Sequence, residues 1–215
     1  MHGSAPHRLT LGTGITLLAQ VAMLLSWPHS TVVAQKPVPA ATVVGLSPEL
    51  QLARMALDKY QDPVVAVHDG YLSTVACVEY TKGSGEGTMH YAPGGMGVHF
   101  LNLQLIGPTL DATKPQVLIY EPDGDRLRLA AAEWFVPVEV AGKRRPTIFG
   151  QELQGPMEGH VPLQPRGLHH YDLHVWLWKN NPAGTFSATN PAVKCPQRGY
   201  SFEESAPKLV GHPEN

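Results

Sequence analysis

Apolar residues near position 50 recur at helical spacing and mark the start of the folded part of the chain. They are Leu50, Ala53, Leu57 and Tyr60. The preceding Ser47-Pro48-Glu49 supplies an N-cap serine, a proline at the first helical position and an acid in the first turn. This pattern predicts a helix over residues 48–60, ended by Asp62-Pro63. The apolar residues of Val64–Leu72 predict a second short helix.

Beyond residue 73 the apolar positions form short runs rich in β-branched and aromatic residues, which is typical of strands. The segment 121–125 between two of these runs contains Asp-Gly, a strong signal for a β-hairpin. Two stretches are predicted to be long loops: 83–97, which carries six glycines, and 139–168, where proline and glycine recur. The predicted strands are Thr74–Tyr80, Val98–Ile106, Gln116–Tyr120, Leu127–Val138 and His170–Trp178.

These elements predict an α+β fold: a short N-terminal helical segment followed by a mainly antiparallel β-sheet or small barrel-like domain with long loops. The chain has 21 glycines and 20 prolines among 215 residues, which favours a loop-rich β domain over a helical one. We expect a single globular domain over 47–200, preceded by a linker at 35–46 and followed by a flexible tail at 201–215.

The first 34 residues have the pattern of a signal peptide. Arg8 is their one basic residue and they contain no acid, while Leu9–Leu25 is mostly apolar and Val32-Val33-Ala34 offers small side chains before a cut ahead of Gln35. The alternative is an uncleaved membrane anchor, but an interrupted run of 17 residues is short of the roughly 20 needed to span a bilayer. We therefore predict an exported protein, periplasmic or secreted, with no integral membrane segment after cleavage.

The two cysteines, Cys77 and Cys195, agree with export, because an oxidising compartment favours their pairing. A bridge between them would close a loop of more than a hundred residues. Two buried free thiols are the alternative. The chain has no Cys-x-x-Cys motif, which argues against a catalytic dithiol.

Charge argues against a nucleic-acid partner. Without residues 1–34 the chain keeps 15 basic and 18 acidic residues, a net charge of 15 − 18 = −3. The basic triplet Lys143-Arg144-Arg145 stands alone in a predicted loop and forms no stripe. Phosphate-loop, calcium-loop and serine-nucleophile motifs are also missing from the sequence.

Candidate chemistry lies in the predicted strands. In 170–178, His170, Asp172 and His174 alternate with apolar residues and therefore share one face. His170 and His174 would be about 13 Å apart on a strand, too far to share one ion easily, whereas each can pair with Asp172. Glu133 stands in an apolar run, where a carboxylate is costly to bury without a partner.

If the strand that carries His99 neighbours those of Glu133 and His174, these side chains can converge. Such a His/carboxylate set suits one divalent transition metal ion: zinc, copper, iron or manganese. The predicted metal ligands are His99, Glu133, His170 and His174, with Glu121 and Asp172 as second choices. The alternative is a buried hydrogen-bond network in a non-enzymatic envelope or secreted binding module. A weaker hypothesis is carbohydrate binding by Trp176 and Trp178. No reaction is predicted.

Several strings of the sequence resemble a family of uncharacterised exported bacterial proteins. The resemblance spans roughly residues 50–196 and implies a bacterial source and one shared domain, but no mechanism. His99, Glu121, Glu133, His170 and His174 match its motif positions, whereas His90, His169 and His212 fall outside. The strings are Gly95–Phe100, Tyr120–Gly124, Lys59–Asp62 with Asp69–Tyr71, and His170–Phe186 with Asn190–Cys195.

Overall fold

The N-terminal helices form where the capping residues predict them. In the computed structural model, helix α1 spans Pro48–Leu57, and the side chain of Ser47 accepts a hydrogen bond from the Leu50 amide. A 3-10 turn, η1 (Asp58–Gln61), completes the predicted helix. Helix α2 spans Pro63–His68 and is shorter than predicted, because Leu72 already begins the first strand.

The structure describes residues 45–86, 89–157, 169–196 and 201–202, all within one compact unit of the chain. The predicted signal peptide and the linker up to residue 44 lie outside these residues. Within them, no helix is long and apolar enough to cross a membrane.

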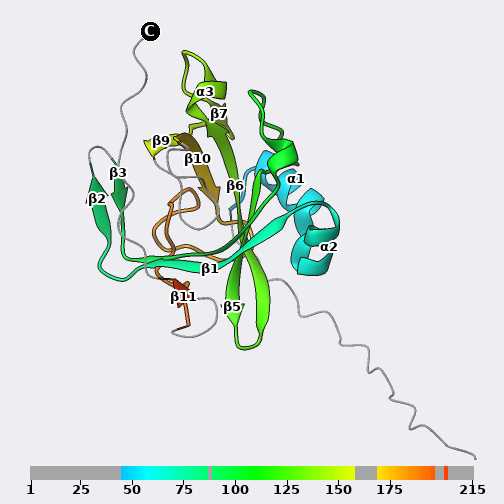
Figure 1. The fold of residues 1–215 in the computed structure, drawn as a ribbon, viewed down its shortest axis with the longest axis vertical. Helices are drawn as coiled ribbons and strands as arrows, with labels where there is room; N and C mark the ends of the chain where they lie inside the picture. Colours follow the sequence, from blue (N-terminus) through cyan, green and yellow to red (C-terminus); the bar gives the residue numbers. More distant parts are fainter. Residues whose placement is uncertain (1–44, 87–88, 158–168, 197–200, 203–215) are drawn as a thin grey trace, which may run out of the picture. The chain divides into compact units, whose positions relative to one another are not determined.

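A curled, seven-stranded sheet makes up most of the fold (Figure 1). Its order is β11-β1-β4-β5-β6-β10-β9, and every pair of neighbours is antiparallel except β1 with β11. The predicted α+β class with a mainly antiparallel sheet is therefore confirmed. The strands are β1 (Leu72–Tyr80), β4 (Gly94–Leu101), β5 (Val117–Asp123), β6 (Arg126–Pro137), β9 (Gln154–Met157), β10 (His170–Val175) and β11 (Ser201–Phe202), the last within the predicted tail.

The predicted loop 83–97 is wrong in part, because much of it pairs. The hairpin β2 (Ser84–Glu86) and β3 (Met89–Tyr91) lies inside it, and β4 begins at Gly94. The glycines permit close approach instead of a loop: Gly95 exchanges two backbone hydrogen bonds with Asn190, of 3.0 and 2.9 Å. A Cβ on the adjacent Gly94 would meet the Asn190 backbone at 2.6 Å.

The predicted strand 98–106 ends early, at Leu101. The side chain of Asn102 accepts a hydrogen bond from the Gln104 amide and donates one to the Asp69 carbonyl, which turns the chain into a 3-10 segment, η2 (Leu103–Leu105). The predicted loop 139–168 likewise contains short elements. They are β9, helix α3 (Val138–Ala141) and the hairpin of β7 (Thr147–Ile148) and β8 (Gln151–Glu152).

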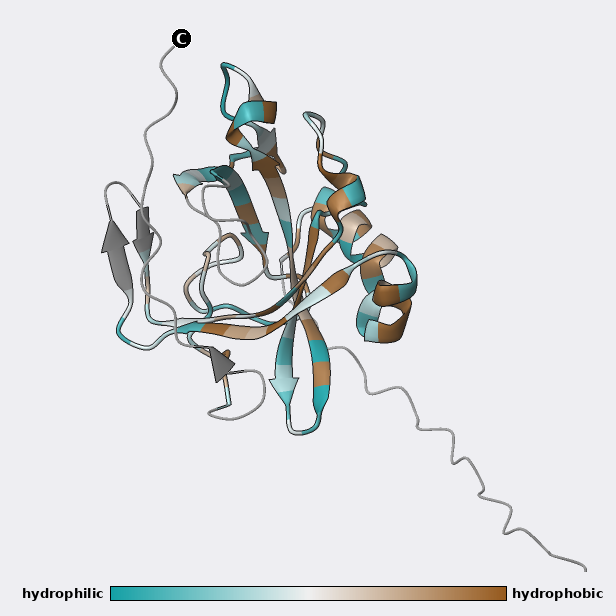
Figure 2. Ribbon diagram, viewed as in Figure 1, coloured by the Kyte–Doolittle hydropathy of each residue, from teal (hydrophilic) through white to brown (hydrophobic). Residues whose placement is uncertain are grey.

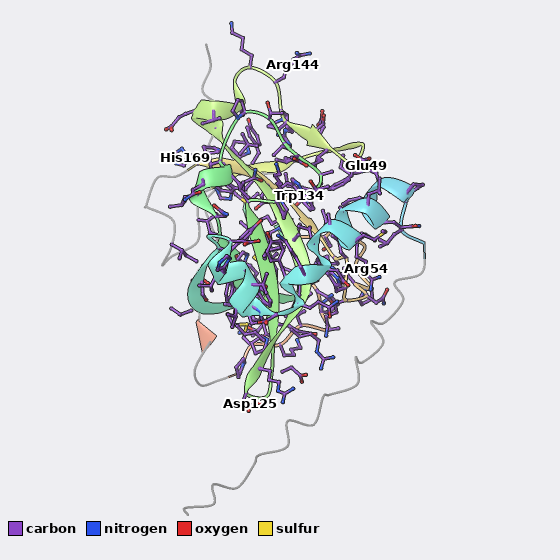
Figure 3. All side chains as sticks on the ribbon, turned by 90° about the vertical axis from the view of Figure 1, so that its right-hand side faces the viewer. Glu49, Arg54, Asp125, Trp134, Arg144 and His169 are labelled. Carbon is purple, nitrogen blue, oxygen red and sulfur yellow. A yellow bond between two sulfur atoms is a disulfide. The ribbon has the colours of Figure 1, made fainter. Side chains whose placement is uncertain are left out.

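The β5–β6 hairpin confirms the Asp-Gly signal. Asp123 pairs with Arg126 across the turn, where Gly124 adopts a φ of +64°. Figure 3 shows Asp125 at the tip of this hairpin and Trp134, on β6, among packed side chains. The indole of Trp134 is fully buried and donates a hydrogen bond of 2.8 Å to the Asp111 carbonyl.

Strand β10 and the part of β6 from Leu129 onward are buried on both faces. On one face, Tyr171, Leu173 and Val175 join the main apolar core together with buried residues of α1. On the other face lie buried polar residues beside a second, smaller apolar cluster that includes Trp176. Figure 2 shows hydrophilic (teal) residues on β10 next to the largely apolar (brown) upper part of β6. The sheet therefore has polar groups enclosed within its packed interior.

The disulfide predicted between Cys77 and Cys195 is present. It joins β1 to the segment that follows Asn190, across 118 residues of chain. Glu79 reinforces the junction by accepting hydrogen bonds from the Cys195 amide and the Lys194 ammonium, of 2.7 and 3.1 Å. The bond is consistent with an oxidising compartment.

Gly97→Ala is expected to destabilise the domain by roughly 1–3 kcal/mol or more, because Gly97 combines two constraints. Its φ is +92°, and an added Cβ would lie 2.6 Å from the Tyr120 carbonyl oxygen on the neighbouring strand. Urea unfolding measures the effect. Gly107→Ala is the matched control, since Gly107 has no atom within 4 Å of an added Cβ. Equal stability of the two variants would contradict the prediction.

Candidate metal centre

Three strands bring the candidate ligands together. Glu133 on β6 lies directly opposite His174 on β10, and His99 comes from β4. Strands β4 and β6 are separated by β5, so their backbones are about 9–10 Å apart. The side chains of His99 and Glu133 nevertheless meet, with His99 Nε2 and Glu133 Oε2 3.5 Å apart. The convergence predicted for these three residues is what the structure shows.

The carboxylate of Glu133 is the centre of this group. Its Oε2 lies 3.5 Å from His99 Nε2 and 3.7 Å from His174 Nε2. The two imidazole rings stand nearly perpendicular, at 85°, with centroids 5.9 Å apart. One ligand atom from each residue lies within 4.8 Å of the other two. The three side chains thus enclose a common point.

Asp172 extends the cluster along β10. Its Oδ1 lies 3.7 Å from His174 Nδ1 and its Oδ2 lies 3.5 Å from His170 Nε2. Glu133, His170 and Asp172 also have one ligand atom each within 4.8 Å of one another. His170 and His174 do not occur in the same group, in agreement with the spacing argument from the sequence. Asp172, a second choice in the sequence, lies in the middle of the cluster.

The five residues are almost completely buried. The side chain of His99 is 10% exposed and that of Glu133 4%, whereas His170, Asp172 and His174 are at 2% or less. In the described part of the chain, both ring nitrogens of His174 and the Oδ1 of Asp172 make no hydrogen bond. Buried polar atoms of this kind are costly unless something satisfies them.

The charges of the cluster shift the titration of two groups. Burial alone would raise the pKa of Asp172, but the imidazoles of His170 and His174 outweigh it and hold this pKa well below its usual range. Burial would lower the pKa of His174, but the negative charges of Glu133 and then Asp172 raise it. In the protein without metal, the neighbouring charges therefore favour the ionised form of Asp172 and the protonated form of His174.

The distances from Glu133 to the two imidazoles fit a shared ion. Ligands held about 2.1 Å from one ion at a tetrahedral angle are about 3.4 Å from each other. The distances of 3.5 and 3.7 Å from Glu133 are close to this value and exceed the usual 2.7–3.2 Å of an N–H···O bond. Buried His, Glu and Asp groups are therefore positioned to hold a metal ion.

Two other sequence candidates do not belong to the cluster. Glu121, a second-choice ligand, forms an ion pair with Lys179 instead. The indoles of Trp176 and Trp178 are buried, at 1% and 8% exposure, and donate hydrogen bonds to the Ser187 carbonyl and to Asp58. Because stacking on a sugar needs an exposed ring face, the carbohydrate hypothesis is wrong for these residues.

Comparisons with known protein families, with curated proteins and with solved structures find no match for this chain.

Proposed function

We propose that this protein binds one divalent transition metal ion through His99 Nε2, Glu133 Oε2 and His174 Nε2. The observation that carries the proposal is the buried carboxylate of Glu133 with an imidazole nitrogen on each side at metal-sharing distance. The three ligands come from three strands of one sheet, which gives the ion a rigid frame.

Charge balance supports a divalent ion. Among the residues that the structure describes, three neutral histidines and the two carboxylates of Glu133 and Asp172 give the cluster a charge of −2, which one divalent ion neutralises. Two imidazoles and a carboxylate suit zinc, copper, iron or manganese. They do not suit calcium, which takes six to eight oxygen ligands.

The site is enclosed, and this limits its chemistry. His99 is the most exposed ligand, so an ion would enter from its side of the cluster. Three protein ligands leave one tetrahedral position for water or another small ligand. The geometry supports a metal-binding protein whose ion is held away from large substrates.

The proposal places the protein in the periplasm or outside the cell. The leader pattern of residues 1–34, the Cys77–Cys195 disulfide and the resemblance to exported bacterial proteins support this location. An exported metal-binding protein meets its ion in that compartment or is loaded before it arrives there.

Elemental analysis tests the proposal. We expect one divalent transition ion per chain in oxidised protein purified without an affinity tag or chelator. Glu133→Gln and His99→Ala are each expected to lose it, because each removes one of three ligands. His68→Ala is the control, since the side chain of His68 is 87% exposed at the end of α2 and belongs to neither group of candidate ligands. A metal-free wild type, or equal metal in Glu133→Gln, would refute the proposal.

A second candidate function is a metal-free polar network that fixes the core of a binding module. It is favoured by the alternation of imidazoles and carboxylates in the order His99, Glu133, His174, Asp172, His170. Protonation of two of the three histidines would balance the negative charges of the two carboxylates. In that case added zinc leaves the melting temperature of the wild type unchanged. Metal binding predicts a rise that depends on zinc concentration and that Glu133→Gln lacks.

A further inference from the structure

We propose that Asp172 and His170 form the outer shell of the metal site, with Asp172 as a positioning residue that orients His174 from the side away from the ion. This inference rests on the proposed function. It assigns a role to the half of the cluster that the three metal ligands do not use, and it excludes a second ion there.

The orientation of His174 is the first observation. Its two ring nitrogens face different carboxylates: Nε2 faces Glu133 and Nδ1 faces Asp172, each at 3.7 Å. A metal-bound imidazole commonly donates its other N–H to a carboxylate, which fixes the tautomer and raises the basicity of the ligand. A shift of about 0.8 Å would bring Nδ1 and Oδ1 to hydrogen-bond distance.

The second observation is that Asp172 is itself held. Its other oxygen, Oδ2, lies 3.5 Å from His170 Nε2, and the ring of His170 packs against Phe135 with centroids 4.5 Å apart. Both side chains are nearly inaccessible to solvent, so neither can exchange its partner for bulk water. The series His174, Asp172, His170 therefore joins the proposed ligand His174 to side chains that are fixed in the packed interior.

The competing arrangement is a second ion between Glu133, His170 and Asp172, whose ligand atoms also lie within 4.8 Å of one another. Counted over the described residues of the cluster, two divalent ions would bring four positive charges against two carboxylates and leave +2 enclosed by protein. Each uncompensated buried charge costs several kcal/mol. One ion leaves the cluster neutral, so the charges favour an outer shell over a second site.

If these residues form an outer shell, replacing one of them weakens metal binding but leaves the number of ions bound per chain unchanged. Replacing such a partner typically lowers metal affinity 10–100-fold. Asp172→Asn keeps the shape of the side chain and removes its charge, so we expect one ion per chain with an affinity reduced by about that factor. His170→Gln acts one step further from the ion, and we expect a smaller reduction.

Titration of metal-free protein with zinc against a competing chelator measures both quantities. The cobalt(II) absorption spectrum gives a second readout, because it depends on the geometry of the bound ligands and a merely structural role would not change it. Asp123→Asn is the matched control: Asp123 is half exposed at the β5–β6 hairpin, where its partner is Arg128. We expect the control to bind zinc like the wild type.

The outcomes separate this inference from the proposed function. One ion in the wild type, lost in Glu133→Gln and bound with unchanged affinity and cobalt spectrum by Asp172→Asn, would overturn the outer shell alone. Two ions in the wild type and one in Asp172→Asn or His170→Gln would show that these residues bind a second ion and do not form an outer shell. No ion in the wild type would overturn both proposals. If Asp172→Asn is unfolded, His170→Gln decides, because normal affinity and spectrum in that variant contradict the outer shell.

Discussion

Reduction of the Cys77–Cys195 disulfide is expected to lower the free energy of unfolding by about 4–5 kcal/mol. The bond spans 118 residues, and the chain-entropy model assigns a closed loop of about 100 residues nearly 5 kcal/mol at 25 °C. This is a large part of the 5–15 kcal/mol of a typical domain. Urea unfolding of the oxidised and the reduced protein measures the difference.

The double variant Cys77→Ala/Cys195→Ala is the control for effects of the reductant. It is expected to unfold near the midpoint of the reduced wild type, and added reductant should leave it unchanged. The hydrogen bonds of Glu79 to the chain around Cys195 do not depend on the sulfur atoms, so we expect the reduced fold to persist at low temperature. A loss below 1 kcal/mol on reduction would contradict the prediction.

Glu133→Ala is expected to destabilise even the metal-free protein by about 3–5 kcal/mol, which is typical when one partner of a buried ion pair is removed. The variant takes away the carboxylate that faces both His99 and His174, and leaves a protonated or unsatisfied imidazole in the interior. Thermal unfolding in the presence of a chelator measures this effect without the contribution of an ion.

Two further variants test whether the loss of stability in Glu133→Ala comes from the buried carboxylate. Glu139→Ala removes an exposed carboxylate of α3, and we expect a change within about 0.5 kcal/mol. Glu133→Gln keeps the shape and one acceptor, so it should lie between Glu139→Ala and Glu133→Ala. If Glu133→Ala were as stable as the wild type, the cluster would not need its central carboxylate, and an ionised buried network would be excluded.

Much of the fold follows from local patterns. The alternation along 170–178 placed Asp172 and His174 on the face opposite Leu173, and the structure confirms it for β10. The Asp-Gly turn and the N-cap of Ser47 are equally local, since each depends on residues within a few positions. Such signals can be recognised in the sequence because the residues that interact lie within the same short segment of the chain.

What the sequence could not predict depends on contacts between distant segments. The glycines at 94–97 pair with Asn190 and approach Tyr120, and no local pattern identifies those neighbours. The sequence offers Glu121 and Asp172 as equivalent second-choice ligands, yet Lys179 pairs with Glu121, whereas Asp172 lies between two histidines. Which carboxylate enters the cluster is decided by strand register and curl.

The proposed ligands come from three strands, β4, β6 and β10, so one ion can bind all of them only in the folded chain. His99 and His174 are separated by 75 residues, from 174 − 99, and Glu133 lies between them. Because the denatured chain does not hold these three ligands together, an ion that binds the proposed site favours the folded ensemble, and each tenfold rise in its free concentration above the Kd adds up to about 1.4 kcal/mol of stability. The lifetime of the protein would then follow the metal supply of its surroundings, and starvation for that metal would expose the chain to proteolysis before any loss of synthesis.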